Sequence, residues 1–336
     1  MAGFAPGRAC AVAVSGGGDS VALMHLLCGH ARQLGYPLPI VLTVDHGLRP
    51  SSAKDAKTVA AWARRLGLAA TVLKWRGRKP KSGVEAAARE ARYRLMGHFL
   101  RQRDIATLFV GHNQDDQAET FLLRLARGSG LDGLAAMQPR APWPVEGFAQ
   151  LTLARPLLGM SREILRTYLK ARGQDWLEDP MNTDSAFDRV KVRQARDALA
   201  GAGLTAPRIA AAAVHLARAR ESLEVVTQAV LARAARKQDE NLLLDPSALA
   251  AAPREVGLRA LASVLMAVGG QSYRPRFESL ERLYDRIAAG DLRGGATLHG
   301  CQIRPLGNKA KEFAPYSLIV SPESPRKTVS STRRRV

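Results

Sequence analysis

The chain has 336 residues, 46% hydrophobic and 24% charged, which suits one large domain or two ordinary ones and excludes an intrinsically disordered protein. No apolar run approaches the roughly 20 residues that cross a bilayer, and the first apolar stretch is too short for a signal peptide. We therefore expect a cytoplasmic protein without a membrane segment. Fifty Lys and Arg residues against thirty Asp and Glu give a net charge of +20 at pH 7, which favours a polyanionic partner such as nucleic acid.

Short apolar runs alternate with longer helical patterns through the first half of the chain. This alternation predicts an α/β fold with a doubly wound, mostly parallel sheet that helices cover on both faces. Ligands of such sheets bind at the carboxyl ends of the strands. The predicted strands cover 9–14, 39–47, 70–75, 106–112 and 151–158, and the predicted helices cover 19–34, 52–66, 83–103, a segment ending at 127, and 161–172.

The composition changes after residue 194, where long Ala- and Arg-rich helical patterns begin. We predict domain boundaries that give a first domain over 1–201, a second, mainly helical domain over 202–320 and a basic, disordered tail over 321–336. Within the second domain, the predicted helices cover 204–237, 253–268 and 277–289, and a small hairpin covers 294–305.

Between the first predicted strand and helix lies the hexapeptide SGGGDS. It lacks the lysine of a Walker A loop and the third glycine of a dinucleotide-binding loop. Its glycines still allow a tight turn that presents backbone N–H groups to an anion at a helix N-terminus. Asp19 would repel a phosphate unless a divalent cation lies between them, which implies Mg²⁺ with Asp19 as a ligand. The predicted phosphate-binding residues are Ser15, Gly16, Gly17, Gly18, Asp19 and Ser20.

Two helices carry chemistry-bearing side chains on one face. Asp116 and Glu119 are three residues apart, with His112 at the preceding strand end, and Arg92 shares a face with Glu85. A solvated ion-pair face is the alternative interpretation of the helix that carries Arg92. The sequence also predicts Asp115 as a helix N-cap, with metal binding as the alternative, and Leu125 as a core residue.

These motifs resemble a known family. SGGGDS resembles the pyrophosphate loop of the N-type ATP pyrophosphatases (the PP-loop superfamily), which cleave ATP between its α- and β-phosphates. Five further motifs resemble, in order, those of the tRNA(Ile)-lysidine synthetase family: VDHGLRPSSAKDAKTVAAWARRLG (44–67), EAAAREARYRLM (85–96), GHNQDDQAETFLLRLARGSGLDGLAAM (111–137), RPLLGMSREILRTYL (155–169) and WLEDPMNTD (176–184).

The resemblance implies a ligase that joins the ε-amine of free L-lysine to C2 of the wobble cytidine in tRNA(Ile) with a CAU anticodon. ATP adenylates the C2 oxygen with Mg²⁺ present, pyrophosphate leaves, and lysine then displaces AMP. The resemblance implies that His112 belongs to the ATP site and that Asp45, Arg92, Asp116 and Glu119 are catalytic. Which carboxylate binds lysine and which accepts its proton stays open.

Arg189 and Arg193 are predicted tRNA contacts, although Val190 stands where the family often has Asn. A tRNA 2-thiolase of the same superfamily is an alternative, but it needs a cluster or a catalytic cysteine pair. Cys10, Cys28 and Cys301 form no CxxC pair and are expected to be reduced thiols. A non-catalytic, basic tRNA-binding protein and a small-molecule ligase are further alternatives. The sequence does not distinguish a monomer from a homodimer.

Overall fold

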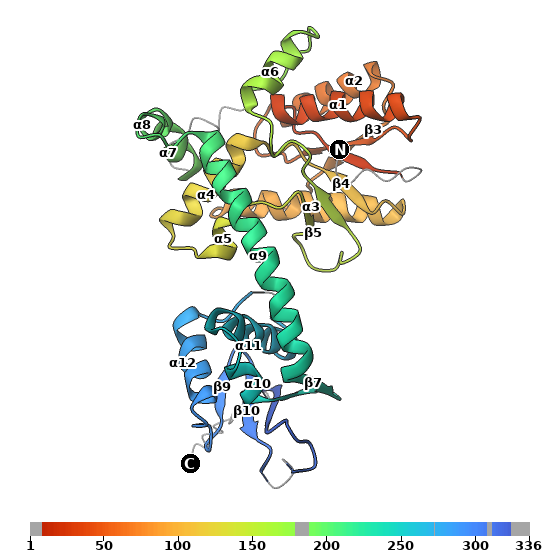
Figure 1. Cartoon of the computed structure of the whole chain (residues 1–336). Helices are drawn as coiled ribbons and strands as arrows, with labels where there is room; N and C mark the ends of the chain where they lie inside the picture. Colours follow the sequence, from red (N-terminus) through yellow and green to blue (C-terminus); the bar gives the residue numbers. More distant parts are fainter. Residues whose placement is uncertain (1–8, 179–187, 272, 308–310, 324–336) are drawn as a thin grey trace, which may run out of the picture. The chain divides into compact units, whose positions relative to one another are not determined.

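The computed structural model describes residues 9–178, 188–271, 273–307 and 311–323 and divides the chain into two compact units, Met1–Arg218 and Ala219–Val336 (Figure 1). The division falls within one long helix, α9 (Ala206–Ala234), and thus later than the boundary predicted at 201. Among the helices in these ranges, none is both long and apolar enough to cross a membrane.

The first unit is built on a six-stranded sheet with the strand order β3-β2-β1-β4-β6-β5. All neighbours pair in parallel except β5 and β6, which confirms the doubly wound, mostly parallel fold. The antiparallel edge strand β5 (Arg140–Pro142) was not predicted, because a proline within a short run argues against a strand. At the edge of the sheet, a proline is tolerated. The remaining strands are β1 (Ala11–Ala13), β2 (Ile40–Asp45), β3 (Ala70–Lys74), β4 (Thr107–Phe109) and β6 (Thr152–Ala154).

Helices cover both faces of this sheet, because successive strand residues point to opposite faces and both faces are apolar. Val12 of β1 packs into a core shared with α1, α2 and α6, whereas its neighbour Ala11 packs into a second core on the face covered by α3. Figure 1 shows α1 and α2 on one side of the strands and α3 on the other. The helices of this unit are α1 (Gly18–Leu34), α2 (Ser52–Arg65), α3 (Val84–Gln102), α4 (Gln114–Ala126), α5 (Leu131–Leu134), α6 (Arg162–Lys170), α7 (Asp188–Gln194) and α8 (Arg196–Gly201).

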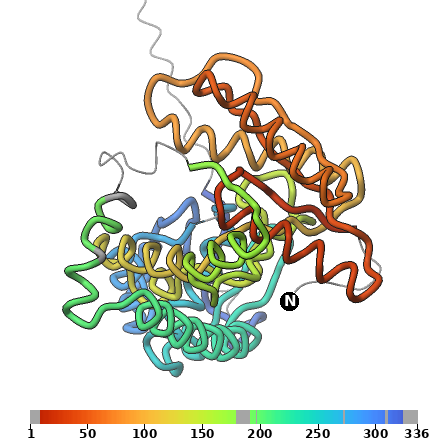
Figure 2. Tube along the Cα trace, turned by 90° about the horizontal axis from the view of Figure 1, so that it is seen from above, coloured from red at the N-terminus to blue at the C-terminus, as the bar shows by residue number. Residues whose placement is uncertain are grey.

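The direction of winding reverses between β1 and β4. The chain runs from β1 through β2 to β3 on one side, and then returns to place β4 on the other side of β1. The first part of this path can be followed in red and orange in Figure 2. Since ligands of open α/β sheets bind where the strand order reverses, the loops after β1 and β4 mark the expected site.

The second unit contains more strand than its sequence suggested. Its sheet is antiparallel with the order β7-β8-β11-β10-β9, and only the β9–β10 hairpin matches the prediction over 294–305. The helix predicted over 204–237 ends at Ala234, and β7 follows directly. The elements are β7 (Ala235–Gln238), β8 (Asn241–Leu244), β9 (Ala296–Leu298), β10 (Cys301–Pro305), β11 (Leu318–Pro322), α10 (Pro246–Ala250), α11 (Arg254–Gly269) and α12 (Phe277–Ala288).

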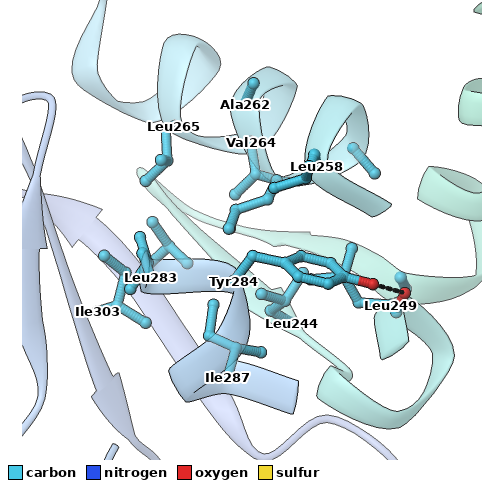
Figure 3. Close-up of a cluster of buried hydrophobic side chains, with 14 of the residues drawn as sticks. Leu244, Leu249, Leu258, Ala262, Val264, Leu265, Leu283, Tyr284, Ile287 and Ile303 are labelled. Carbon is cyan, nitrogen blue, oxygen red and sulfur yellow. Dashed lines mark hydrogen bonds between the residues drawn. The ribbon is translucent and has the colours of Figure 1, made fainter. Parts of the chain in front are cut away.

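The core of the second unit lies between this sheet and helices α10, α11 and α12. Figure 3 shows Tyr284 of α12 among leucines of the neighbouring elements, with its hydroxyl donating to the carbonyl of Leu249 at 3.3 Å. The predicted disordered tail begins too early, because Ser321 and Pro322 belong to β11. Residues 324–336 lie outside the described residues.

Candidate active site at the β1 and β4 strand ends

The hexapeptide loop turns sharply between β1 and α1. Gly16 adopts a left-handed conformation (φ 99°), and its carbonyl accepts a hydrogen bond from the N–H of Leu177 at 2.9 Å. A Cβ atom on Gly16 would lie only 2.6 Å from Cδ1 of Leu177. The backbone angle therefore favours glycine at this position, and a larger residue would also have to displace the side chain of Leu177.

Helix α1 begins at the end of the loop, with Gly17 as its N-cap and no side-chain cap. The Ser20 hydroxyl donates to the Gly17 carbonyl at 2.9 Å, and the Ser15 N–H donates to the Ser20 hydroxyl oxygen at 3.2 Å. These bonds fix the loop against the first turn, where backbone N–H groups lack helical partners. This geometry suits the binding of an anion at the positive end of a helix dipole.

A cavity of about 800 Å³ lies over this loop and extends between the ends of β2, α3, β4 and α6. Of the predicted site residues, Gly16, Asp45 and Glu119 are not among its lining residues. The predicted residues that line it are Ser15, Gly17, Gly18, Asp19, Ser20, Arg92, His112, Asp116 and Arg193.

A cluster of acidic side chains on one side of this cavity surrounds Arg162, which lies at the first turn of α6. Its guanidinium lies 3.3 Å from Asp19 Oδ2, 3.3 Å from Asp116 Oδ1 and 3.8 Å from Glu119 Oε1. Its backbone N–H donates to Asp115 Oδ2 at 2.8 Å. One arginine therefore joins four acidic residues from α1 and α4.

Burial shifts the pKa values of this cluster. The pKa of Asp116 is raised to about 6: desolvation is the main cause, Arg162 partly offsets it, and the charge of Glu119 adds to the rise. Desolvation also raises the pKa of Asp19, again against the effect of Arg162. For Arg162 itself, burial lowers the pKa, but the surrounding carboxylates outweigh burial and raise it overall.

Glu119 lies at the edge of a second cavity of about 160 Å³, which Leu122 and Ile209 also line. Its carboxylate is buried and accepts two hydrogen bonds from Arg193, at 2.6 and 3.0 Å. Arg193, predicted as a tRNA contact, thus forms an ion pair with the buried carboxylate of Glu119. The side chain of Arg189 lies outside the described residues, so its predicted tRNA contact stays a prediction.

The helix cap of α4 corrects one prediction. The N-cap is Asn113, whose side chain accepts from the Asp116 N–H at 2.9 Å, while the Asp116 side chain accepts from the Asn113 N–H at 3.0 Å. Asp115 lies after the cap, in the first turn of α4, and its carboxylate accepts the hydrogen bond from the Arg162 N–H at the start of α6. Leu125 is not a core residue either, since half of its surface is exposed.

Asp45 and Arg92 organise the loop after β2. Asp45 Oδ1 accepts hydrogen bonds from the Ser52 hydroxyl at 2.7 Å and the Gly47 N–H at 3.1 Å. Arg92 donates through Nε to Nε2 of His46 at 3.4 Å. Burial and the charge of Arg92 lower the pKa of His46 to about 4, so this ring is neutral at physiological pH.

Comparisons with known proteins identify the family of this chain. Residues 3–196 match the family model described as a PP-loop domain. The chain is 41% identical over 337 residues to the tRNA(Ile)-lysidine synthase of Methylobacterium nodulans, which covers 96% of this chain and 93% of that protein. This chain belongs to the tRNA(Ile)-lysidine synthase family. The synthase of Ruegeria pomeroyi is 40% identical and covers 91% of this chain and 71% of that protein.

A solved structure supports the fold of this family member. The U34-tRNA thiolase NcsA from Methanococcus maripaludis superposes with a TM-score of 0.52 and 16% identity, over 65% of this chain and 73% of that chain. At this identity the likeness concerns the fold alone.

Two arginines of this tRNA(Ile)-lysidine synthase family member escaped the sequence reasoning. Arg155 follows β6, is 8% exposed, and donates through Nε to Nδ1 of His112 at 3.2 Å. Arg162 was overlooked as well, although both lie in the RPLLGMSREILRTYL motif. Their place in that motif was the feature that could have identified them. Taken alone, an arginine on a helix predicts only a solvated face.

Proposed function

We propose that this protein ligates free L-lysine to C2 of the wobble cytidine in tRNA(Ile) with a CAU anticodon, at the expense of ATP. ATP transfers AMP to the C2 oxygen and pyrophosphate leaves; the lysine ε-amine then displaces AMP and gives lysidine, which pairs with A. The observation that carries this proposal is the convergence of the loop at 15–20, Arg92 and Asp116 on one cavity. A tRNA substrate of this kind also favours the cytoplasm as the site of action.

The first requirement of the reaction is a bound triphosphate with a good leaving group. The N–H groups of the loop and of the first turn of α1 are arranged to hold pyrophosphate as it departs. Arg92 enters the same cavity from α3 and is held by His46. A fixed cation there would stabilise the negative charge that develops on the transferring phosphate.

The second requirement is an amine nucleophile that binds as an ammonium ion and then loses a proton. Asp116 suits the role of base, because it lines the large cavity and its pKa of about 6 lies near neutrality. Glu119 suits the binding of an ammonium group, because its buried carboxylate already holds the cationic guanidinium of Arg193. Lysine would compete with that arginine.

Mg²⁺ fits the donor set around Asp19. One oxygen of Asp19, Oδ1, is buried and has no hydrogen-bond partner among the described residues, so it is suited to a cation. Such an ion would be held by this carboxylate together with substrate phosphates. When bound, Mg²⁺ would neutralise phosphate charge during pyrophosphate release.

The cysteines favour this ligase over a thiolase. Cys10 and Cys28 lie in the core of the first unit and Cys301 in the core of the second. Burial raises the pKa values of Cys10 and Cys301 to about 11, whereas sulfur transfer needs reactive thiolates.

The experiment that tests the proposal measures incorporation of labelled lysine into a CAU-anticodon tRNA(Ile) transcript with ATP and Mg²⁺. Elongator methionine tRNA, which carries the same anticodon, is the RNA control. We expect label in tRNA(Ile) only, and none with Arg92→Gln. Arg94→Gln is the matched control, since this half-exposed arginine of the same helix pairs with Glu90 on the helix surface. RNA-dependent pyrophosphate release without label would refute lysine as the nucleophile.

A further inference from the structure

His112 and His46 both line the large cavity, and each accepts a hydrogen bond from an arginine, but at opposite ring nitrogens. Arg155 donates to Nδ1 of His112 at 3.2 Å, whereas Arg92 donates to Nε2 of His46 at 3.4 Å. Every polar hydrogen of a guanidinium is a donor, and arginine keeps its charge at all working pH values. The ring nitrogen that faces each arginine must therefore be the unprotonated one.

Arg155 is held firmly enough to impose this choice. It is 8% exposed, and its Nη1 donates to the carbonyl of Gln138 at 2.9 Å while Nε faces His112. Arg155 follows β6 and His112 follows the neighbouring strand β4, with the Val110 N–H donating to the Ala154 carbonyl between them at 2.9 Å. The pairing of two rigid strands thus fixes the arginine against the histidine ring.

His112 also lies directly beside the phosphate loop. Its neighbour Gly111 touches the first turn of α1 so closely that a Cβ atom there would lie 2.9 Å from the backbone nitrogen of Ser20. His112 lines the same cavity as Gly17 and Gly18. An N–H group of the His112 ring would therefore be within the region that receives the phosphates.

We propose that Arg155 is a positioning residue that fixes His112 as the Nε2–H tautomer, so that the ring donates a hydrogen bond to a phosphate oxygen of bound ATP. The ATP part rests on the proposed function, whereas the tautomer part does not. With Nδ1 unprotonated toward Arg155, the only N–H of the neutral ring is Nε2–H. The other tautomer would offer a phosphate a lone pair, and would turn an N–H toward the guanidinium.

His46 provides an internal contrast, because Arg92 requires its Nδ1–H tautomer. Nitrogen-15 spectra of the ring nitrogens distinguish the two forms in the ATP-free protein at pH 7.5. We expect a protonated Nε2 for His112 and a protonated Nδ1 for His46. In Arg155→Gln, the His112 signals should move toward the average of two tautomers while those of His46 stay in place.

Arg101→Gln is the matched control. Arg101 lies on the exposed surface of α3 and contacts Nδ1 of His98 at 3.3 Å, so its loss removes an arginine–histidine pair that faces solvent. We expect the His112 signals to stay unchanged in this variant. A protonated Nδ1 on His112 in the wild type, or unchanged His112 signals in folded Arg155→Gln, would overturn the proposal.

Two substitutions of His112 test the same idea without altering Arg155. Glutamine places an amide NH₂ near the position of Nε2, whereas asparagine reaches only that of Nδ1. The probe is a non-hydrolysable ATP analogue with Mg²⁺, in equilibrium dialysis without tRNA. We expect His112→Gln to keep its Kd within about 3-fold and His112→Asn to weaken binding about 10-fold or more, since a lost hydrogen bond to a charged group costs that much.

Equal affinity of the two variants would refute the contact with phosphate. Failure of lysine incorporation, with the tautomers and the ATP affinities as expected, would instead refute only the proposed ligase activity. If Arg155→Gln does not fold, Arg155→Lys together with the two His112 variants still decides the question. The lysine variant keeps a positive charge but cannot donate to both His112 and Gln138 from a planar fork.

Discussion

The contact between Gly111 and the first turn of α1 predicts opposite effects for two glycine-to-alanine substitutions in the same unit. At Gly111, a new Cβ would lie 2.9 Å from both N and Cα of Ser20 and 3.0 Å from the carbonyl carbon of Asp19. All three are backbone atoms, so no rotamer change relieves the clash. Ordinary contact begins at 3.4 Å, so the end of β4 and the start of α1 must separate by about 0.5 Å.

The cost follows from the tightness of the packing. Overpacking of this kind costs about 1–3 kcal/mol, and for a unit of this size each kcal/mol lowers Tm by about 2–4 °C. Gly111→Ala should therefore lower the Tm of the first unit by roughly 2–12 °C. Because the displaced atoms belong to Ser20 and Asp19, ATP affinity should fall as well.

Gly29 is the matched control, because it is exposed in the middle of α1 and a Cβ there meets no atom within 4 Å. Alanine has less backbone freedom to lose on folding, so Gly29→Ala should stabilise the unit by about 0.5–1 kcal/mol. Scanning calorimetry with and without Mg²⁺·ATP measures both variants. A Gly111→Ala protein with wild-type Tm and ATP affinity would refute the packing argument, and a destabilised Gly29→Ala would refute the use of this helix as a reference.

Three further substitutions have defined outcomes. Glu119→Ala removes both hydrogen bonds to Arg193 and should cost roughly 1.5–3 kcal/mol in urea unfolding; a change below 0.5 kcal/mol, a rough bound for surface sites, would contradict a structural ion pair. His46 has a pKa of about 4 in the folded protein, below its value in the unfolded chain, so protonation of the unfolded state lowers stability as pH falls from about 6.5 toward 4. His46→Gln should therefore lose about 2 kcal/mol less than wild type between pH 7 and pH 5, and an identical pH dependence would show that the ring is solvated. Tyr284→Phe removes the bond to the Leu249 carbonyl and should cost about 1 kcal/mol in the unfolding of the second unit, without effect on ATP binding.

The sequence predicted the part of the site that depends on local structure. The strand, loop and helix around Gly16 follow from an apolar run, three glycines and a helical pattern, all within about 25 residues. Their position at the sheet edge followed from the alternation of strands and helices. The same reasoning brought His112 and Asp116 to that edge, because parallel strands share one carboxyl-terminal side.

Tertiary contacts account for what the sequence did not predict. Arg162 looks like an ordinary first-turn residue of an amphipathic helix, and only the packing of α6 against α1, beside the start of α4, brings it to Asp19 and Asp116. In the second unit, β11 pairs with β8 across more than 70 residues, and neither strand alternates clearly. Non-local pairing of short strands leaves no periodic signal in a single sequence.

The arginines of the site also change how the net charge should be interpreted. A charge of +20 favours a nucleic-acid partner only to the extent that the basic groups lie on the surface. Arg162 and Arg193 neutralise buried carboxylates, and Arg155 is directed at a histidine and a carbonyl. These side chains serve the geometry of the cavity, so they should contribute little to the salt dependence of tRNA binding. The electrostatic footprint for tRNA must therefore be sought among other basic residues than those that define the active site.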